Sequence, residues 1–172
     1  MLVIETERLI VRHLNNGDAQ FMFELLNDPG WIKFIGNRNI HTVNDAKNHI
    51  RDKYISSYKK HGYGLYLVEE KETLLPLGVC GLINRPEIED IDKGFAFLPQ
   101  YAGNGYAYEA SRAVLNYGYQ HLKLDRIVAI TIPENTRSIN LLKKLGMKIE
   151  GYVNFQGDKK CLLFVPSEDE KL

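Results

Sequence analysis

The sequence has little cysteine, no excess of charge of either sign and no long apolar run. Among 172 residues there are two cysteines, and 22 basic side chains are balanced by 22 acidic ones. Balanced charge creates no field that would attract nucleic acid or an anionic membrane. No apolar stretch has membrane-spanning length, and the first residues do not resemble a secretory leader. We therefore expect a cytoplasmic protein with no nucleic-acid or membrane partner.

The two cysteines and five histidines do not form a recognisable ligand set. Cys80 and Cys161 are far apart, and each lies within an apolar stretch. This setting favours buried free thiols over a disulfide or a metal framework. No pair of histidines or cysteines has the spacing of a zinc site. We expect no metal.

Length and composition suit one compact unit. A hydrophobic content of 44% in 172 residues is enough for one full core and leaves little room for a second. The sequence contains no internal repeat and no low-complexity linker. We predict a single domain over residues 1–172, with a flexible acidic tail at 167–172, that exists as a monomer or homodimer.

The first sixty residues predict a strand followed by two helices. The strand is expected at residues 8–12, and the turn at 16–18 then begins a helix that stops at Pro29. Thr42 is a typical helix cap, and the second helix is expected to run to about Lys59.

The remaining residues predict a mixed α/β fold with antiparallel strands first and alternating strands and helices later. Apolar runs bounded by turn residues indicate the strands, and apolar residues at helical spacing indicate the helices. The expected strands are 64–68, 77–83, 91–98, 126–131 and two closing strands around Tyr152 and 162–165, with helices after Gly105 and from Asn135 to Leu145.

The junction after the strand at 91–98 is the most informative part of the chain. Gly103 and Gly105 break that strand and open a helix. Such a junction directs free backbone N–H groups and the positive end of the helix at one point, where an anion is favoured. Glycines allow positive φ and close approach of a phosphate to the backbone. A plain tight turn is the alternative, which the two glycines alone do not exclude.

Two familiar nucleotide-binding patterns do not fit this junction. The dinucleotide fingerprint needs a small third residue where Tyr108 stands, and the acidic residue about 20 positions later, Asp125, begins a strand instead of ending one. A phosphate-binding loop of the ATPase type needs Gly-Lys followed by Ser or Thr, which does not occur.

The junction resembles the acyl-coenzyme A motif of the GNAT superfamily. That motif has Gln or Arg, two residues, Gly, one residue, and then Gly or Ala, and it corresponds here to Ala102, Gly103, Asn104, Gly105, Tyr106 and Ala107. Ala102 departs from the pattern, so a side-chain contact from the first position is lost while the backbone cradle remains. Four stretches resemble the subgroup of ribosomal-protein N-terminal acetyltransferases, namely 4–12, 92–99, 105–109, and 133–138 together with 144–147.

The resemblance covers nearly the whole chain and implies a fold and a co-substrate. The fold would be a GNAT-like, mostly antiparallel sheet that is splayed between its central strands and flanked by helices. The co-substrate would be acetyl-coenzyme A, with its pantetheine arm in the splay. The backbone N–H groups near Phe97 and Leu98 would stabilise the charge that develops on the thioester oxygen.

Strand alternation at 91–98 gives one small face that carries a single carboxylate, Asp92. This face suits the floor of a narrow cleft, and Asp92 is a candidate to accept a proton from the incoming ammonium, directly or through water. An ordinary carboxylate is ionised at neutral pH, so its main effect would be to attract and orient the ammonium. The alternative is an Asp that only solvates a turn or pairs with Lys93.

Ser138 begins the buried stripe of the last helix, which continues at Leu141, Leu142 and Leu145. By resemblance, Ser138 would bond the coenzyme sulfur and assist thiolate departure. Many superfamily members have a tyrosine acid where Leu142 stands, and this departure makes Ser138 or water the candidate. Ser138 bonded to its own helical turn is the alternative. Asn135 is expected to cap the helix and, by resemblance, to bond the cofactor arm.

The expected activity is transfer of an acetyl group to a primary amine by direct attack in a ternary complex. Trp31, Phe34 and Arg38 are weak candidates for the acceptor side, and a core role for Trp31 is the simpler interpretation. A protein N-terminus, a polyamine or an amino sugar are all possible acceptors. An acyl-coenzyme A sensor or docking domain without turnover is a second hypothesis, which the departures at Ala102 and Leu142 favour slightly.

Overall fold

A computed structural model describes residues 1–167 as a mixed α/β fold around one eight-stranded sheet. The strand order in the sheet is β1-β2-β3-β4-β5-β6-β8-β7. In chain order the strands are β1 Leu2–Glu5, β2 Leu9–Arg12, β3 Leu65–Glu70, β4 Pro76–Ile83, β5 Ile91–Phe97, β6 Ile127–Thr131, β7 Met147–Phe155 and β8 Lys159–Pro166.

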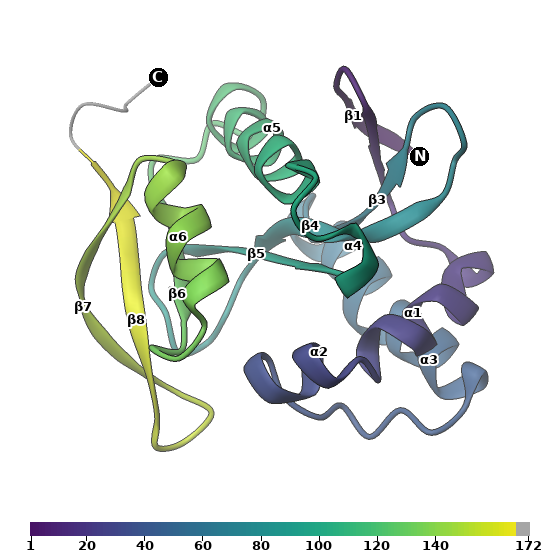
Figure 1. Ribbon diagram of the computed structural model, residues 1–172, viewed down its shortest axis with the longest axis horizontal. Helices are drawn as coiled ribbons and strands as arrows, with labels where there is room; N and C mark the ends of the chain where they lie inside the picture. Colours follow the sequence, from purple (N-terminus) through teal and green to yellow (C-terminus); the bar gives the residue numbers. More distant parts are fainter. Residues whose placement is uncertain (168–172) are drawn as a thin grey trace.

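The helices lie on both faces of this sheet (Figure 1). Helix α5 packs on the face formed by β2 to β5, and α1 and α3 lie on the opposite face. The helices are α1 Ala19–Leu26, α2 Pro29–Phe34, α3 Val43–His49, α4 Ser56–His61, α5 Tyr106–Gln120 and α6 Thr136–Lys144, with a π-helical segment Ile50–Ile55 between α3 and α4.

The central strands separate from each other soon after they begin to pair. All neighbouring strands are antiparallel except β5 and β6, which are parallel. Only two residue pairs join β5 to β6, namely Ile91 with Ile127 and Asp92 with Val128. Beyond Asp92 the two strands diverge, whereas β5 stays paired with β4 as far as Phe97. The splayed, mostly antiparallel sheet implied by the resemblance is therefore confirmed.

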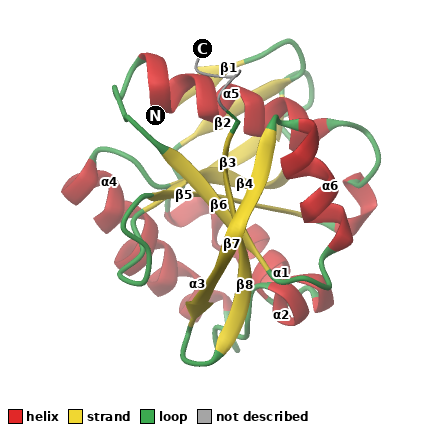
Figure 2. Cartoon of the chain, turned by 90° about the vertical axis from the view of Figure 1, so that its left-hand side faces the viewer, coloured by secondary structure: helices red, strands yellow, loops and turns green. Residues whose placement is uncertain are grey.

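Beyond the splay, the sheet ends in a long hairpin. Strands β7 and β8 pair over nearly their whole length, and β8 also pairs with β6. Helix α6 packs against these strands through a small core cluster that includes Leu142 and Phe164. Figure 2 shows α6 beside the crossing strands of the hairpin. The hairpin and α6 together hold β6 on the far side of the splay from β5.

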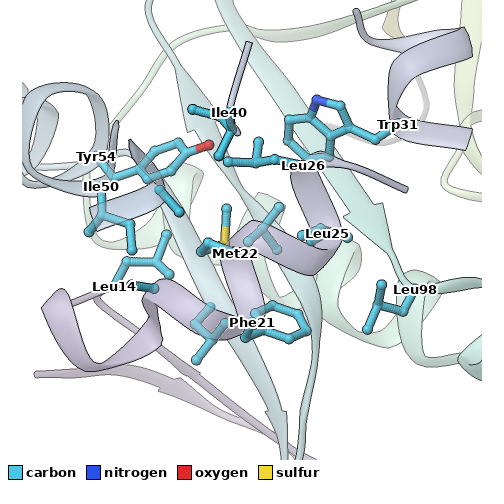
Figure 3. Packing of buried hydrophobic residues seen from close by; sticks show 14 residues of the cluster. Leu14, Phe21, Met22, Leu25, Leu26, Trp31, Ile40, Ile50, Tyr54 and Leu98 are labelled. Carbon is cyan, nitrogen blue, oxygen red and sulfur yellow. The ribbon is translucent and has the colours of Figure 1, made fainter. Parts of the chain in front are cut away.

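The apolar core on the α1 and α3 face of the sheet binds the N-terminal helices to it. Figure 3 shows this cluster, in which Met22, Leu25 and Leu26 of α1 lie among residues from neighbouring segments. Trp31 of α2 and Tyr54 of the π-helical segment belong to the same cluster. The prediction of a core tryptophan is confirmed, because Trp31 is only 5% exposed.

The helical prediction for the first sixty residues needs one correction. Pro29 does not only end a helix: it occupies the first turn of α2, because the side chain of Asp28 accepts hydrogen bonds from the N–H groups of Gly30 and Trp31. Three helical segments therefore precede β3 where two were expected. The cap at Thr42 is confirmed, and the helix that it begins continues through the π-helical segment to His61.

Other sequence predictions agree with the structure. Cys80 and Cys161 are buried free thiols, as expected. The strand β1 was not predicted, and the acidic tail at 168–172 lies outside the described residues. Within residues 1–167, no helix has both the length and the apolar character needed to cross a membrane.

Candidate active site

The divergence of β5 and β6 opens into a large cavity. Its volume is about 1120 Å³, and it extends from α2 and the π-helical segment, past β5, to the first turns of α5 and α6. All the predicted site residues except Leu98 and Asn104 line this one cavity, and they include Asp92, Ser138, Asn135, Trp31, Phe34 and Arg38. The sequence thus predicted residues that the fold brings together from distant segments.

Asp92 lies at the apex of the splay and is 1% exposed. One carboxylate oxygen accepts a bond from Arg85 Nε at 2.5 Å, and the other accepts from the backbone N–H of Ile130 at 3.2 Å. The carboxylate therefore joins β5 to β6 at the position where their ladder ends. Burial raises the pKa of the Asp92 carboxyl, and the bonds from Arg85 and Ile130 oppose this shift.

The partner of Asp92 differs from the one considered in the sequence. Pairing with Lys93 does not occur, because neighbouring side chains of a strand point to opposite faces. Lys93 is buried beneath the sheet, where its ammonium contacts the Ser111 hydroxyl of α5 and lies 3.9 Å from the centre of the Phe95 ring. Burial lowers the pKa of Lys93 to about 8.

The glycine junction has the conformation that the sequence predicted. Gly103 and Gly105 have φ of +83° and +80°, in the left-handed region that favours glycine. Gly105 is the N-cap of α5, and no side chain caps the helix. The first N–H groups of α5 are thus left for another acceptor, and a Cβ at Gly103 would meet open space. These features fit a pyrophosphate such as that of coenzyme A.

Side chains from the N-terminus brace this junction from behind. Arg8 forms an ion pair with Glu109 of α5 at 2.7 Å and donates to the carbonyl of Asn104 at 3.0 Å. Thr6 also donates to Glu109, at 2.6 Å, and the Arg8 guanidinium lies over the Tyr106 ring. Asn104 itself turns its side chain toward the carbonyl of Tyr101. The turn is therefore fixed by contacts that leave its outer face free.

The start of α6 forms the opposite side of the splay. Asn135 caps the helix as predicted, because its side-chain oxygen accepts from the N–H of Ser138 at 3.2 Å. Ser138 is 8% exposed and lines the cavity, and its hydroxyl forms no hydrogen bond within residues 1–167. The alternative of a serine bonded to its own helical turn is not observed. Leu142, at 1% exposure, belongs to the core, so no acid is available at that position.

The two backbone groups expected to face the thioester differ from each other. The N–H of Leu98 donates to the carbonyl of Leu77 at 3.1 Å, so it is not available to a ligand, and Leu98 belongs to the apolar core. Because N–H directions alternate along an antiparallel ladder, the N–H of Phe97 points away from β4 and into the splay. The prediction for Leu98 is corrected on this ground, and Phe97 remains.

The sequence analysis missed the contribution of several charged residues. Arg85 lies in a loop seven positions before Asp92, with no periodic pattern to mark it, and its guanidinium also lies over the Phe155 ring. Arg8 and Glu109 were noticed only as parts of motifs. Among residues 1–167, no group of three or more His, Cys, Asp or Glu side chains is placed to hold a metal ion.

Comparison with known proteins agrees with this geometry. The uncharacterised N-acetyltransferase YnaD of Bacillus subtilis is 31% identical over 159 residues, which are 92% of this chain and 87% of YnaD. The ribosomal-protein uS5 alanine N-acetyltransferase of Escherichia coli is 32% identical over 57% of this chain and 52% of its own. The Escherichia coli spermidine N(1)-acetyltransferase is 23% identical over 82% and 73% of the two chains.

A solved structure and a family model complete the comparison. The crystal structure of a GNAT-family acetyltransferase from Bacillus anthracis has a TM-score of 0.79 at 28% identity, covering 99% of this chain and all of the other. A family model described as an acetyltransferase (GNAT) domain matches residues 8–148. The chain therefore belongs to the GNAT acetyltransferase family.

Proposed function

We propose that this protein transfers an acetyl group from acetyl-coenzyme A directly to a primary amine, with no covalent enzyme intermediate. The observation that carries the proposal is that one cavity connects the glycine junction, the splay apex and a wall of side chains from α2 and the π-helical segment. An anion-binding end and a separate acceptor end in one space suit a ternary complex. Proximity within it would supply much of the rate acceleration.

The cofactor end relies mainly on backbone groups. The first N–H groups of α5 would hold the pyrophosphate, and the N–H of Phe97 would stabilise the negative charge that develops on the acetyl oxygen. Both sets of donors are fixed by the fold before any ligand binds, because Gly105 has its positive φ and β5 stays paired with β4.

Ser138 is the proposed donor to the departing sulfur. Its hydroxyl is nearly buried, lines the cavity and has no partner within the described chain. A thiol has a pKa of about 8.5, so a thiolate leaves readily and a neutral hydroxyl donor is sufficient.

Asp92 is proposed to act on the amine through charge. Both of its oxygens already accept hydrogen bonds, so neither is free to take the proton, and its pairing with Arg85 reduces the charge that the ammonium meets. Asp92 would therefore only help to orient the amine, and a water would take the proton. An α-amine, with a pKa near ~8, needs much less help than a lysine side chain near ~10.4. This role therefore suits an α-amine better than a lysine.

Direct transfer also agrees with the state of the two thiols. Burial raises the pKa of Cys80 and of Cys161, which keeps both as poorly nucleophilic thiols. Cys80 is fully buried and faces Ser111 beneath the sheet. Replacement of Cys80 by Ala should leave acetylation in place.

The test is steady-state kinetics of acetylation with Ser138→Ala and Asp92→Asn, alongside calorimetric binding of acetyl-coenzyme A. We expect Ser138→Ala to lower kcat at least ~10-fold, which is less than the ~10²–10⁴-fold typical of a general acid because a thiolate leaves readily, with little change in cofactor affinity. Thr136→Ala is the matched control, since Thr136 is exposed in the same helical turn. Equal kcat values for Ser138→Ala and Thr136→Ala would show that Ser138 has no role in the reaction.

A sensor without turnover remains the competing function. It is favoured by the small Ala102 at the junction and by the burial of Leu142 where an acid is missing. Cofactor binding with no acetylation of any amine would support the sensor and overturn the enzyme.

A further inference from the structure

The acceptor end of the cavity has an unpaired positive charge. Arg38 is half-buried and lines the cavity, yet its guanidinium forms no ion pair or hydrogen bond with any residue of the described chain. Arginine in a partly buried site normally meets a carboxylate or phosphate, to which it can donate two parallel bonds. The guanidinium is thus available for a group that enters from outside.

The surroundings of Arg38 are basic. Lys53 is exposed, but it lines the same wall and also has no ion pair within residues 1–167. Burial first, and then the charges of Arg38 and Lys53, lower the pKa of His49, which also lines this wall. Asp52 acts in the opposite direction on His49, but it is exposed and pairs with Arg51 at 2.7 Å. The local potential is therefore positive.

The carboxylates of the cavity do not compensate Arg38. Asp28 accepts two backbone N–H groups as the cap of α2, and Asp92 is bound by Arg85. Glu87 lines the cavity but is exposed. An acidic mouth suited to a polyamine is absent from this part of the described chain.

A second unpartnered donor lies on the same wall. The indole N–H of Trp31 is buried and has no hydrogen-bond acceptor within residues 1–167, although Trp31 lines the cavity. A buried donor without an acceptor is costly, so a ligand oxygen that reached the Trp31 N–H after a small movement of the wall would be stabilised there. Arg38, and Trp31 after such a movement, thus offer donors to oxygens of a ligand.

We infer that the acceptor is a primary amine that carries a carboxylate, which Arg38 binds while Trp31 donates to a neighbouring carbonyl. This inference rests on the proposed function, because it names the acceptor class for that site. Two sources can supply this carboxylate: the free end of an amino acid or dipeptide, and an acidic side chain near a peptide N-terminus. The chemistry recognised is the same in both.

The kinetic test uses acceptors that differ in charge while the reacting amine stays the same. In the first pair, alanyl-glutamate amide has an acidic side chain and alanyl-glutamine amide a neutral one. In the second pair, alanyl-alanine has a free carboxylate at its C-terminal end and alanyl-alanine amide has a neutral amide there. We expect kcat/KM to be at least ~10-fold higher for the acidic member of the preferred pair, a difference typical of one charged hydrogen bond. Spermidine should be a poor acceptor.

Arg38→Gln should remove this preference through KM, leaving the neutral acceptors and the affinity for acetyl-coenzyme A unchanged. Arg51→Gln is the matched control, because Arg51 lies on the neighbouring π-helical segment and pairs with Asp52 outside the cavity. Arg38→Glu should favour alanyl-lysine amide over alanyl-glutamate amide. The inference is overturned if acidic and neutral acceptors are used equally, or if Arg38→Gln and Arg51→Gln behave alike.

A binding measurement separates this inference from the proposed function. Trp31 is the only tryptophan in the sequence, so its fluorescence reports on the acceptor wall directly. In the presence of coenzyme A, N-acetyl-alanyl-glutamate amide should change that fluorescence at lower concentration than its glutamine counterpart, and only with Arg38 present. This result without turnover would refute the enzyme and keep the subsite, whereas turnover without charge preference would refute the subsite alone.

Discussion

The two ends of the cavity are built in different ways. At the cofactor end the donors are backbone N–H groups of α5 and β5, set by the positive φ of Gly105 and by strand pairing. At the acceptor end the polar groups are side chains, Trp31 and Arg38, with no partners inside the described chain. Backbone recognition is fixed by the fold, whereas side chains can be exchanged with little cost to it. Under the proposed function, a scaffold built in this way could keep its cofactor site while substitutions change the acceptor that it binds.

The largest expected effect is a loss of stability at the ion pair of Arg85 and Asp92, which lies where the two ends of the cavity meet. Arg85→Met leaves a buried carboxylate without its partner, which should lower the free energy of unfolding by about 3 kcal/mol at neutral pH. Urea unfolding measures this change. The double variant Arg85→Met with Asp92→Asn should be more stable than Arg85→Met alone, since the unpaired charge is then gone.

The pH dependence of that loss follows from the pKa of Asp92. Burial raises this pKa in the folded state, and removal of Arg85 raises it further. The folded Arg85→Met protein then binds more protons than the unfolded chain above about pH 4, so its stability falls as pH rises. The loss should therefore shrink as the pH is lowered toward 4. A loss that is constant with pH would show that Arg85 acts through packing.

A glycine substitution at the proposed cofactor end tests whether backbone N–H groups of the junction bind the cofactor. Gly105→Ala places a side chain at φ of +80° and 3.4 Å from Arg8 Nη2, which should distort the junction proposed to hold the pyrophosphate. We expect the Kd for acetyl-coenzyme A to rise at least ~10-fold, or ~1.4 kcal/mol. Gly62→Ala is the matched control, because Gly62 has the same φ and open surroundings at the end of α4. Equal affinities of the two variants for acetyl-coenzyme A would show that the junction does not bind the cofactor.

The smallest effect concerns Lys93, whose buried ammonium contacts the Ser111 hydroxyl of α5. Because its pKa falls to about 8 on folding, the unfolded chain binds more protons between about pH 8 and ~10, and stability rises with pH across that window. Lys93→Met should therefore raise the free energy of unfolding at pH 7 by about 1 kcal/mol, and by less at pH 10. An equal gain in the free energy of unfolding at both pH values would contradict a destabilising buried ammonium at Lys93. Cofactor affinity should not change.

Local patterns predicted most of the cofactor end. The glycines of the junction, the cap at Asn135 and the alternation around Asp92 are all short-range features, and each has the predicted local structure. The splay itself came from family resemblance, because no local pattern shows where two distant strands stop pairing. Leu98 was misjudged for the same reason, since its N–H direction depends on its register with Leu77.

The acceptor end was much harder to predict. Trp31, Phe34 and Arg38 were named only as weak candidates, and the bond between Arg85 and Asp92 depends on how a loop folds back over the sheet. Charge counts over the whole sequence also concealed the local excess around Arg38. A binding site whose side chains come from several segments can be predicted only once the fold is known.

The most direct test of the account is acetylation itself. Purified protein with acetyl-coenzyme A and the amine panel should release free thiol only when an acceptor is present, with one acetyl group found on the acceptor by mass spectrometry for each thiol released. The account predicts this stoichiometry, with the acidic peptides as the best acceptors. Tight binding of acetyl-coenzyme A with no acetylated product from any amine would contradict it.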